Sequence, residues 1–215
     1  FTRYMNRVIE VTDTDATVEP GCFYRDFEKE TLKKDRIMPA YTASREICAV
    51  GGMVANNSAG EKTIKYGKVE DYVKKLKVVF TDGKEYTVIP LTKDALEKKV
   101  KEDSFEGGLY QKLLMLIESH YEEIKQAKPD VSKNSAGYFL WNIYDKATGE
   151  FDLCKLIVGS QGTLGIVTEI TFKIIPTEKY SSLLAIFLPD LKNLGNIVSE
   201  IVPFKPESIE SYDDY

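Results

Sequence analysis

Three glycines punctuate residues 159–169, which read Gly-Ser-Gln-Gly-Thr-Leu-Gly-Ile-Val-Thr-Glu. Glycines at this spacing let the backbone turn tightly and approach a flat or anionic ligand closely. The turn follows a predicted helix at 153–158 and precedes a predicted long strand at 165–175. This order is the reverse of a dinucleotide-binding fingerprint, and the segment lacks the GxxxxGK pattern of a phosphate loop. Two interpretations of this segment therefore remain, a structural turn and a ligand-binding loop.

A second segment, residues 44–60, is rich in glycine, alanine and other small residues. Small residues leave peptide N–H groups accessible, and successive N–H groups can form a nest for phosphate oxygens. Asn57 and Ser58 add side-chain donors. The alternative is a compact polar loop over the core. The wider stretch 39–67 has no regular period, so we expect it to gain its order from whatever it wraps.

Local patterns predict strands in pairs. Residues 7–11 and 16–20 alternate around a polar turn, and residues 73–88 alternate around Asp82-Gly83, so both regions are expected to be β-hairpins. A short strand is expected at 36–38. In the long strand at 165–175, alternate residues are expected to share one face: Ile166, Thr168, Ile170, Phe172 and Ile174.

The apolar spacing predicts helices at 23–34, at 92–101 with an N-terminal cap, and over a longer stretch that ends before Pro129. The first helix is expected to bury Phe23, Phe27 and Leu32. The longest helix has a stripe of apolar residues: Leu109, Leu113, Leu116, Ile117, Tyr121 and Ile124.

After Pro176 the pattern restarts with a strand at 182–188, a helix at 190–202 capped by Asp190, and a strand at 207–212. A β-α-β unit at this place suggests the beginning of a second domain that the chain contains only in part.

Composition excludes several kinds of site. A net charge of −5 gives no reason to expect nucleic-acid binding, and no run reaches the roughly 18 apolar residues of a membrane-spanning helix. Three widely spaced cysteines favour a reducing compartment, and we expect a cytoplasmic protein, with peripheral membrane association of the full protein left open. His120 is the one histidine, so no zinc or iron–sulfur site is expected in this chain, and a surface or structural role is favoured for His120 itself.

The order of the motifs resembles the FAD-linked oxidase family, whose fold is also called the vanillyl-alcohol-oxidase or PCMH type. The resemblance rests on the opening hairpin with Val18-Glu19-Pro20-Gly21, the segment 44–60, Lys65-Tyr66-Gly67, Asp82-Gly83, the element Lys133-Asn134-Ser135-Ala136-Gly137-Tyr138 and the glycine block at 159–169. Within 44–60 the matching residues are Ser44, Cys48, Gly51, Gly52, Ala55, Asn57 and Gly60. Members of the family include D-lactate dehydrogenases, glycolate oxidase flavin subunits and D-2-hydroxyglutarate dehydrogenases.

The resemblance implies an α+β fold. Residues 1–176 would form a PCMH-type FAD-binding domain, N-terminally truncated, with a mixed sheet, flanking helices and a helical insert at about 92–150. Residues 177–215 would begin a ferredoxin-like cap that binds the substrate. FAD would lie in an extended groove.

The resemblance also implies which residues contact FAD. Those expected along the pyrophosphate and toward the flavin are Ser44, Gly51, Gly52, Asn57, Ser58 and Gly60. Those expected near the adenosine end are Gln161, Gly162, Gly165 and Ile166. Tyr66 and Tyr138 are expected to serve packing more than contact. The chain departs from the family pattern at Ala49, Met53, Ala59 and Gln161, and each lost hydrogen bond would weaken binding by about 0.5–1.5 kcal/mol.

The function implied for the full protein is oxidation of a D-2-hydroxy acid, such as D-lactate or glycolate, to a 2-oxo acid, with hydride transfer to flavin N5. The electron acceptor would be a quinone, a cytochrome, an electron-transfer flavoprotein or oxygen. Catalytic residues and any metal or iron–sulfur centre are expected outside this chain, as is the family's other phosphate-binding loop. The fragment alone is therefore expected to be inactive and to retain FAD weakly or not at all. The alternatives are an alcohol, a sugar or an ether-lipid precursor as substrate, or a non-catalytic flavin-binding or interaction module.

Overall fold

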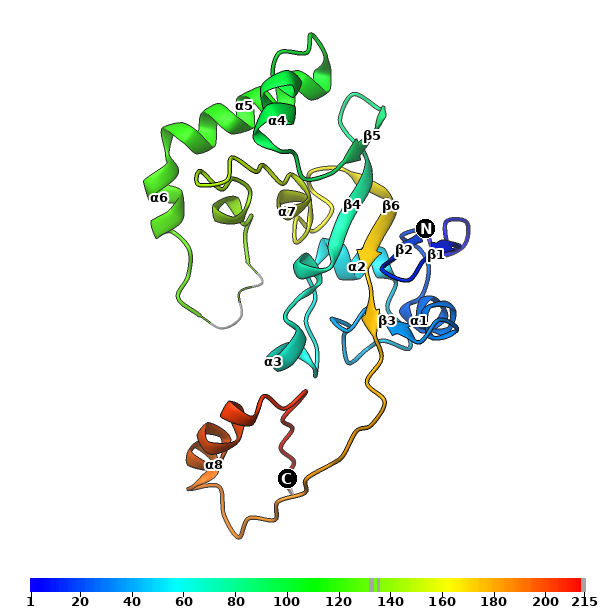
Figure 1. Ribbon diagram of the computed structural model, residues 1–215, viewed down its shortest axis with the longest axis vertical. Coiled ribbons are helices and arrows are strands. Elements are labelled where there is room, and N and C mark those ends of the chain that lie inside the picture. The colour runs from blue at the N-terminus through cyan, green and yellow to red at the C-terminus, as the bar shows by residue number, and fades with distance from the viewer. Residues whose placement is uncertain (132–133, 135, 214–215) are drawn as a thin grey trace.

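The computed structural model describes residues 1–131, 134 and 136–213 (Figure 1). Its centre is a five-stranded sheet in the order β1-β2-β6-β4-β5. The strands are β1 (Val8–Val11), β2 (Asp15–Val18), β4 (Val73–Val79), β5 (Glu85–Val88) and β6 (Ile166–Lys173). Two further short strands, β3 (Arg36–Ile37) and β7 (Ile175–Pro176), pair with each other. The α+β class is confirmed, but every pairing described is antiparallel, so the expectation of a mixed sheet is corrected.

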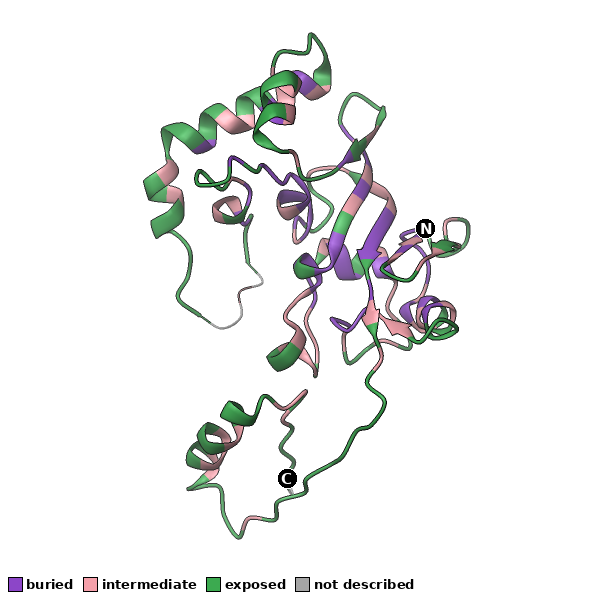
Figure 2. Cartoon of the chain, in the orientation of Figure 1, coloured by how far each residue is buried: buried purple, intermediate pink, exposed green. Residues whose placement is uncertain are grey.

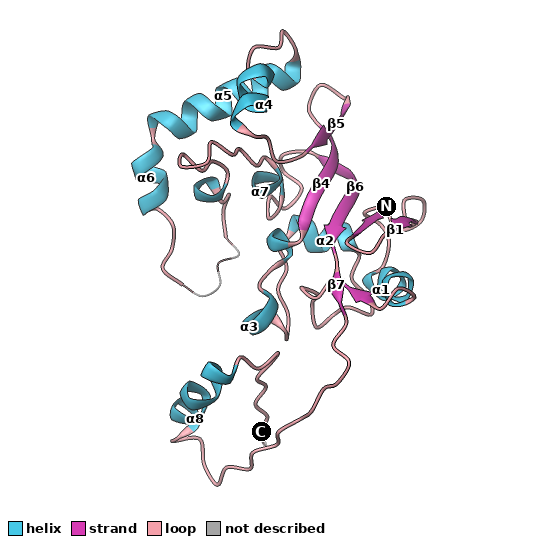
Figure 3. Cartoon of the chain, in the orientation of Figure 1, coloured by secondary structure: helices cyan, strands magenta, loops and turns pink. Residues whose placement is uncertain are grey.

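Both predicted hairpins form, and β6 joins them. It lies between β2 and β4 and is hydrogen-bonded to both (Figure 3). Ile170 and Phe172 in its second half are fully enclosed, and partner strands lie along both of its edges. Ile166 at its start is 52% exposed and Thr168 is half-buried, so the predicted apolar face is buried only in its second half.

Helix α1 (Tyr24–Leu32) packs against the sheet, where the rings of Phe27 and Phe172 lie 5.8 Å apart. Its buried residues are Tyr24, Phe27 and Thr31. The expectation that Phe23 and Leu32 lie inside was wrong. Positions 24, 27 and 31 form one stripe at helical spacing, whereas Phe23 precedes the helix and Leu32 lies on its exposed side.

The stretch 39–67 is more regular than expected. It contains α2 (Val50–Ala55) and the single-turn helix α3 (Thr63–Tyr66), and the 3-10 turn η1 (Val69–Asp71) follows. Helix α2 is anchored at its start, where Val50 N donates to Cys22 O and Gly51 N donates to Pro20 O. A tertiary anchor of this kind orders a short helix whose own sequence carries two glycines and no periodic signal.

The helical insert lies at one end of the sheet (Figure 1). It comprises α4 (Lys93–Lys99), α5 (Phe105–Ser119), α6 (Tyr121–Gln126) and the 3-10 turn η2 (Leu140–Asn142), and α7 (Cys154–Ile157) follows it. Thr92 caps α4, as expected, by accepting a hydrogen bond from Ala95 N. The longest predicted helix is divided at His120, and Leu116 in its stripe is 47% exposed, because α5 reaches the core mainly through Tyr110 and Ile117. His120 itself is exposed and lies 2.9 Å from a Glu123 oxygen, in agreement with a surface role.

Residues 177–213 lie apart from the sheet and are mostly exposed (Figure 2). Only a helix forms there, α8 (Leu194–Ile201), followed by the 3-10 turn η3 (Val202–Phe204). The predicted strands at 182–188 and 207–212 do not form among the described residues, because a strand needs a partner and none lies beside them. Asp190 does not cap the helix, which begins after Asn193; instead it accepts a hydrogen bond from Lys192 N.

A polar contact attaches this segment to α3. Glu207 accepts a hydrogen bond from Tyr66 Oη at 2.7 Å and lies 3.1 Å from Lys62 Nζ, and Lys65 pairs with Glu178 at 3.0 Å. The hydrogen bond from Tyr66 and the nearby Lys62 lower the pKa of Glu207 below its usual value. A carboxyl with a lowered folded-state pKa contributes stability above its unfolded pKa, and this contribution is lost as the pH falls through the lowered value.

We therefore expect the attachment of residues 177–213 to loosen as the pH falls below about 4.5, the ordinary glutamate value. Small-angle scattering should record a larger radius of gyration while circular dichroism stays constant. Glu207→Gln should show the larger radius already at neutral pH and should not change further on acidification. A radius independent of pH in the unsubstituted chain would contradict this role of Glu207.

Candidate functional site

The two glycine-containing motifs meet in space. Gly159 N donates to Val54 O at 2.9 Å, and Gln161 N donates to Ala55 O at 2.8 Å. The Gln161 side chain adds a bond from Nε2 to Asn56 Oδ1 at 3.1 Å. The turn after α7 is thus seated on the C-terminal end of α2, and residues about a hundred positions apart form one surface.

The backbone around this contact is unusual. Asn57 and Gln161 have φ values of 45° and 56°, in the left-handed region that non-glycine residues rarely adopt, and Gly162 has 74°. Residues in this region tend to cluster at ligand sites, where the surrounding structure holds them in place. Here the hydrogen bonds between the turn and α2 supply that constraint.

Asn57 has the most informative side chain at the contact. It is 1% exposed, and its Oδ1 accepts a hydrogen bond from Glu70 N at 3.0 Å. Because an N–H can only donate, the amide oxygen must face Glu70, which leaves Nδ2 as the free end. Nδ2 is the one buried side-chain nitrogen or oxygen without a partner among the described residues.

A buried donor left unpaired costs about 1–3 kcal/mol, so an acceptor from a bound molecule is the simplest account of Asn57 Nδ2. The phosphates, ribose and flavin carbonyls of FAD offer such acceptors. Gly52 is exposed, and a Cβ added there would meet no atom within 4 Å. The same is true of Gly162. The unpaired donor of Asn57 and the open backbone at Gly52 and Gly162 are two separate features of this junction that fit the expectation of a flat, anionic cofactor.

Several other residues predicted to contact FAD have structural roles. A Cβ at Gly51 would lie 2.6 Å from Pro20 Cβ, and one at Gly165 would lie 2.6 Å from Val78 Cγ1, so both glycines allow close packing. Gly60 allows a still closer approach to the Tyr41 carbonyl. Ser58 is buried and accepts a hydrogen bond from Asn56 Nδ2 at 3.2 Å.

Ser44 and Ile166 lie at the margins of the junction between the two motifs. Ser44 is exposed in the turn before α2, where its Oγ lies 2.9 Å from Thr42 Oγ1. No hydrogen bond among the described residues joins Ser44 to the turn at 159–162. Ile166 begins β6 and pairs with Val79.

The two tyrosines rated as packing residues both make polar contacts. Tyr66 Oη reaches Glu207, and Tyr138 Oη lies 2.8 Å from Thr163 Oγ1 in the glycine turn. Lys133 and Ser135 of the same predicted element lie outside the described residues. Sequence reasoning also missed Asn56 and Glu70. Asn56 could have been found as the neighbour of Asn57, whereas no sequence signal marks Glu70.

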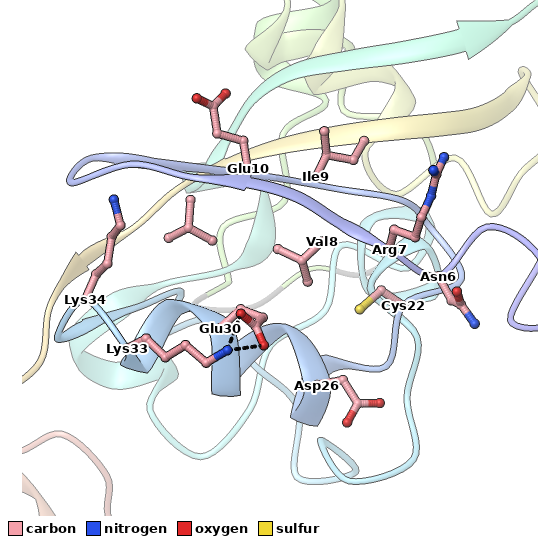
Figure 4. Close-up of a pocket in the computed structure, with 11 residues that line it drawn as sticks. Asn6, Arg7, Val8, Ile9, Glu10, Cys22, Asp26, Glu30, Lys33 and Lys34 are labelled. Carbon is pink, nitrogen blue, oxygen red and sulfur yellow. Dashed lines mark hydrogen bonds and ion pairs between the residues drawn. The ribbon is translucent and has the colours of Figure 1, made fainter.

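A cavity of about 580 Å³ lies between β1 and α1 and contains none of the predicted FAD contacts (Figure 4). Its lining includes Cys22 and the ion pair of Lys33 with Glu30. Burial raises the pKa of the Cys22 thiol to about 11, which makes this cysteine a poor nucleophile.

Two kinds of feature are absent where the chain is described. No group of three or more His, Cys, Asp or Glu side chains could hold a metal ion within residues 1–131, 134 and 136–213. Over the same residues, none of the helices has both the length and the apolar character needed to cross a membrane.

Comparison with known proteins supports the FAD assignment. Residues 1–88 match the family described as "FAD binding domain". The chain is 26% identical to a D-2-hydroxyglutarate dehydrogenase of Pseudomonas putida, over 99% of this chain and 21% of the relative. It is 26% identical to glycolate oxidase subunit GlcD of Bacillus subtilis, over 98% of this chain and 35% of the relative. It is 27% identical to a D-lactate dehydrogenase of Anaerostipes hadrus, over 87% of this chain and 28% of the relative.

Among solved structures, alkyldihydroxyacetonephosphate synthase resembles the chain with a TM-score of 0.50 at 22% identity, over 83% of this chain and 23% of that one. At this identity the likeness shows a shared fold alone. The chain spans only about a fifth to a third of the length of the curated relatives named above. FAD is the cofactor of the matched domain, so residues 1–88 are similar to an FAD binding domain, and the chain is similar over most of its length to flavin-dependent 2-hydroxy-acid dehydrogenases and a glycolate oxidase subunit.

Proposed function

We propose that this chain is the FAD-holding part of a flavin-dependent oxidoreductase that oxidises a D-2-hydroxy acid to a 2-oxo acid. The observation that carries the cofactor site is the free, buried Nδ2 of Asn57 at the junction of the two motifs. Bound FAD would supply the acceptor, at N5, for the hydride that leaves the substrate α-carbon. The residues of this chain bind and orient the cofactor, and none is assigned a proton-transfer role.

The proposed FAD contacts fall into two groups. Asn57, Gly52, Gln161 and Gly162 lie at or beside the junction, with Ser58 buried behind it. The remaining proposed contacts are Ser44, Gly51, Gly60, Gly165 and Ile166. We give the second group a lesser share of the binding free energy, because its glycines already serve packing and its other two members lie at the margins.

We divide the chain into an FAD-binding unit at 1–176, with the helical insert at about 92–150, and the beginning of a cap domain at 177–215. The buried core supports this division, since its residues run from Ala16 to Ile174 and include none of the described residues beyond Pro176. Residues 177–213 carry many exposed apolar side chains, including Leu183 and Phe187 at 93% and 95%. Such a segment is expected to complete its fold with further polypeptide.

The substrate class rests on the relatives, whose names specify D-2-hydroxyglutarate, glycolate and D-lactate. All three are 2-hydroxy acids. The ether-lipid alternative draws on alkyldihydroxyacetonephosphate synthase, which shares the fold alone, so the hydroxy acid is favoured. A cytoplasmic location is proposed from the free Cys22, Cys48 and Cys154, which suit a reducing compartment.

FAD titration followed by flavin fluorescence tests the site. Because the other phosphate-binding loop is expected outside this chain, we expect the unsubstituted chain to quench only at high FAD concentration. The Kd of Gly52→Leu should be about tenfold weaker or more, because the leucine would occupy the open space over α2 that the cofactor needs. Gly108→Leu is the matched control, since Gly108 also lies in a helix with no atom near its Cβ position, but in α5. Equal affinities of the two variants would place FAD elsewhere, and no quenching by the unsubstituted chain would contradict the proposal.

A further inference from the structure

Glu70 is a buried carboxylate that is held by side chains from two directions. It is 7% exposed and lies in the 3-10 turn η1. Its Oε1 is 2.8 Å from Lys68 Nζ, and its Oε2 accepts a hydrogen bond from Asn142 Nδ2 in η2 at 3.3 Å. Its main-chain oxygen accepts a hydrogen bond from Lys155 Nζ in α7. The turn η1 is therefore fixed to two parts of the chain that follow much later in the sequence.

The backbone of Glu70 in turn fixes Asn57. The bond from Glu70 N to Asn57 Oδ1 is the hydrogen bond that this side-chain amide makes among the described residues, and it decides which end of the amide is free. If η1 moved, Asn57 could rotate its side chain and the direction of Nδ2 would be lost. Where the chain is described, the hydrogen bonds and ion pairs of the Glu70 carboxylate go to Lys68 and Asn142 and not to the junction of the motifs, so its influence there would pass through Asn57.

We propose that Glu70, with Lys68, Asn142 and Lys155, is a positioning residue that aims Asn57 Nδ2 at the cofactor; this inference rests on the proposed FAD site. Glu70 does not touch FAD. Its role is to keep the amide oxygen of Asn57 occupied, so that the donor end faces the ligand without reorganisation when FAD binds. A preorganised donor strengthens binding because the ordering of the side chain precedes association.

The first test needs no cofactor. Amide hydrogen exchange at position 70, followed by NMR, should be about tenfold faster in Glu70→Ala than in the unsubstituted chain, because the carboxylate no longer holds η1. Asn57→Ala should also accelerate exchange at this amide by removing its acceptor. The control is Glu19→Gln, since Glu19 is also 7% exposed and ion-paired, with Arg7 at 2.8 Å, but lies at the opening hairpin. Unchanged exchange in Glu70→Ala would overturn the positioning role.

The second test measures the Kd for FAD by fluorescence quenching. Asn57→Asp keeps an acceptor for Glu70 N but removes the donor, so binding should weaken about tenfold. Glu70→Ala should weaken binding about fivefold in the unsubstituted background and leave it unchanged in the Asn57→Asp background, because the two residues act in series. Glu19→Gln should leave the Kd unchanged.

The outcomes separate the two ideas. Equal weakening by Glu70→Ala in both backgrounds, or weakening by Glu19→Gln of the same size, would show a general structural effect and overturn the positioning role. Absence of FAD binding by the unsubstituted chain would overturn the proposed function and the cofactor half of this inference. In that case the exchange measurements would still decide whether Glu70 holds Asn57.

Discussion

Replacing Phe172 with alanine should lower the free energy of unfolding by about 3–5 kcal/mol, the usual range for removing a fully buried phenylalanine. Phe172 is fully enclosed in the central strand β6, opposite Ala16 on β2 and Val73 on β4. Its ring also contacts Phe27 of α1, so truncation would leave a cavity where three strands and a helix meet. Urea unfolding followed by circular dichroism measures the loss.

Ile166→Ala is the control on the same strand. Ile166 is 52% exposed, so its truncation should change the free energy of unfolding by only about 0.5 kcal/mol. Similar losses for the two variants would mean that β6 is not the buried centre of the sheet. If Ile166→Ala nevertheless weakens FAD binding, it would support the proposed contact at the start of β6.

Gly60→Ala should lower the free energy of unfolding by about 1–3 kcal/mol, the range for forcing extra volume into a tight site. A Cβ at this position would overlap the Tyr41 carbonyl oxygen, and backbone cannot move aside as a flexible side chain can. Tyr41 packs in turn on Tyr24, with ring centroids 5.3 Å apart, so the displacement would reach the core. Thermal or urea unfolding checks the size of the effect.

Gly52→Ala provides the comparison within the same motif. Its Cβ would meet nothing within 4 Å, and alanine favours helix, so its stability should be unchanged or raised by about 0.5–1 kcal/mol. A loss at Gly52 equal to that at Gly60 would contradict the assignment of Gly60 to close packing and Gly52 to open surface.

What the sequence predicted well was local. The hairpins around 12–15 and Asp82-Gly83, the Thr92 cap and the strand β6 follow from alternation, turn residues and capping, which act over a few residues. The short helix α2 was missed because its order comes from hydrogen bonds to Pro20 and Cys22, far from it in the sequence. The strands expected at 182–188 and 207–212 were wrong among the described residues, since alternation states a preference and a partner strand must satisfy it.

The candidate site divides in the same way. The two motifs could be selected from their residues and from the family resemblance, and the structure brings them into contact. The sequence could not predict which glycines allow close packing and which leave open surface. Gly51, Gly60 and Gly165 differ from Gly52 only in the atoms that lie next to their Cβ positions. The proposed role of Glu70 could not be predicted from the sequence for the same reason, because it depends on contacts with Asn57 and Asn142, which are distant in the sequence.

The position of β6 has a consequence for the order in which the chain acquires its structure during synthesis. The hairpins β1–β2 and β4–β5 can form as soon as they leave the ribosome, but each would keep an unpaired edge until residues 166–173 arrive. The turn at 159–162 that completes the junction with α2 arrives just before them. The cofactor surface is therefore assembled late and almost together with the sheet. Until β6 pairs with β2 and β4, the inner edges of these two strands stay open in the nascent chain. Open strand edges favour aggregation and are a reason for chaperones to bind the chain at this stage.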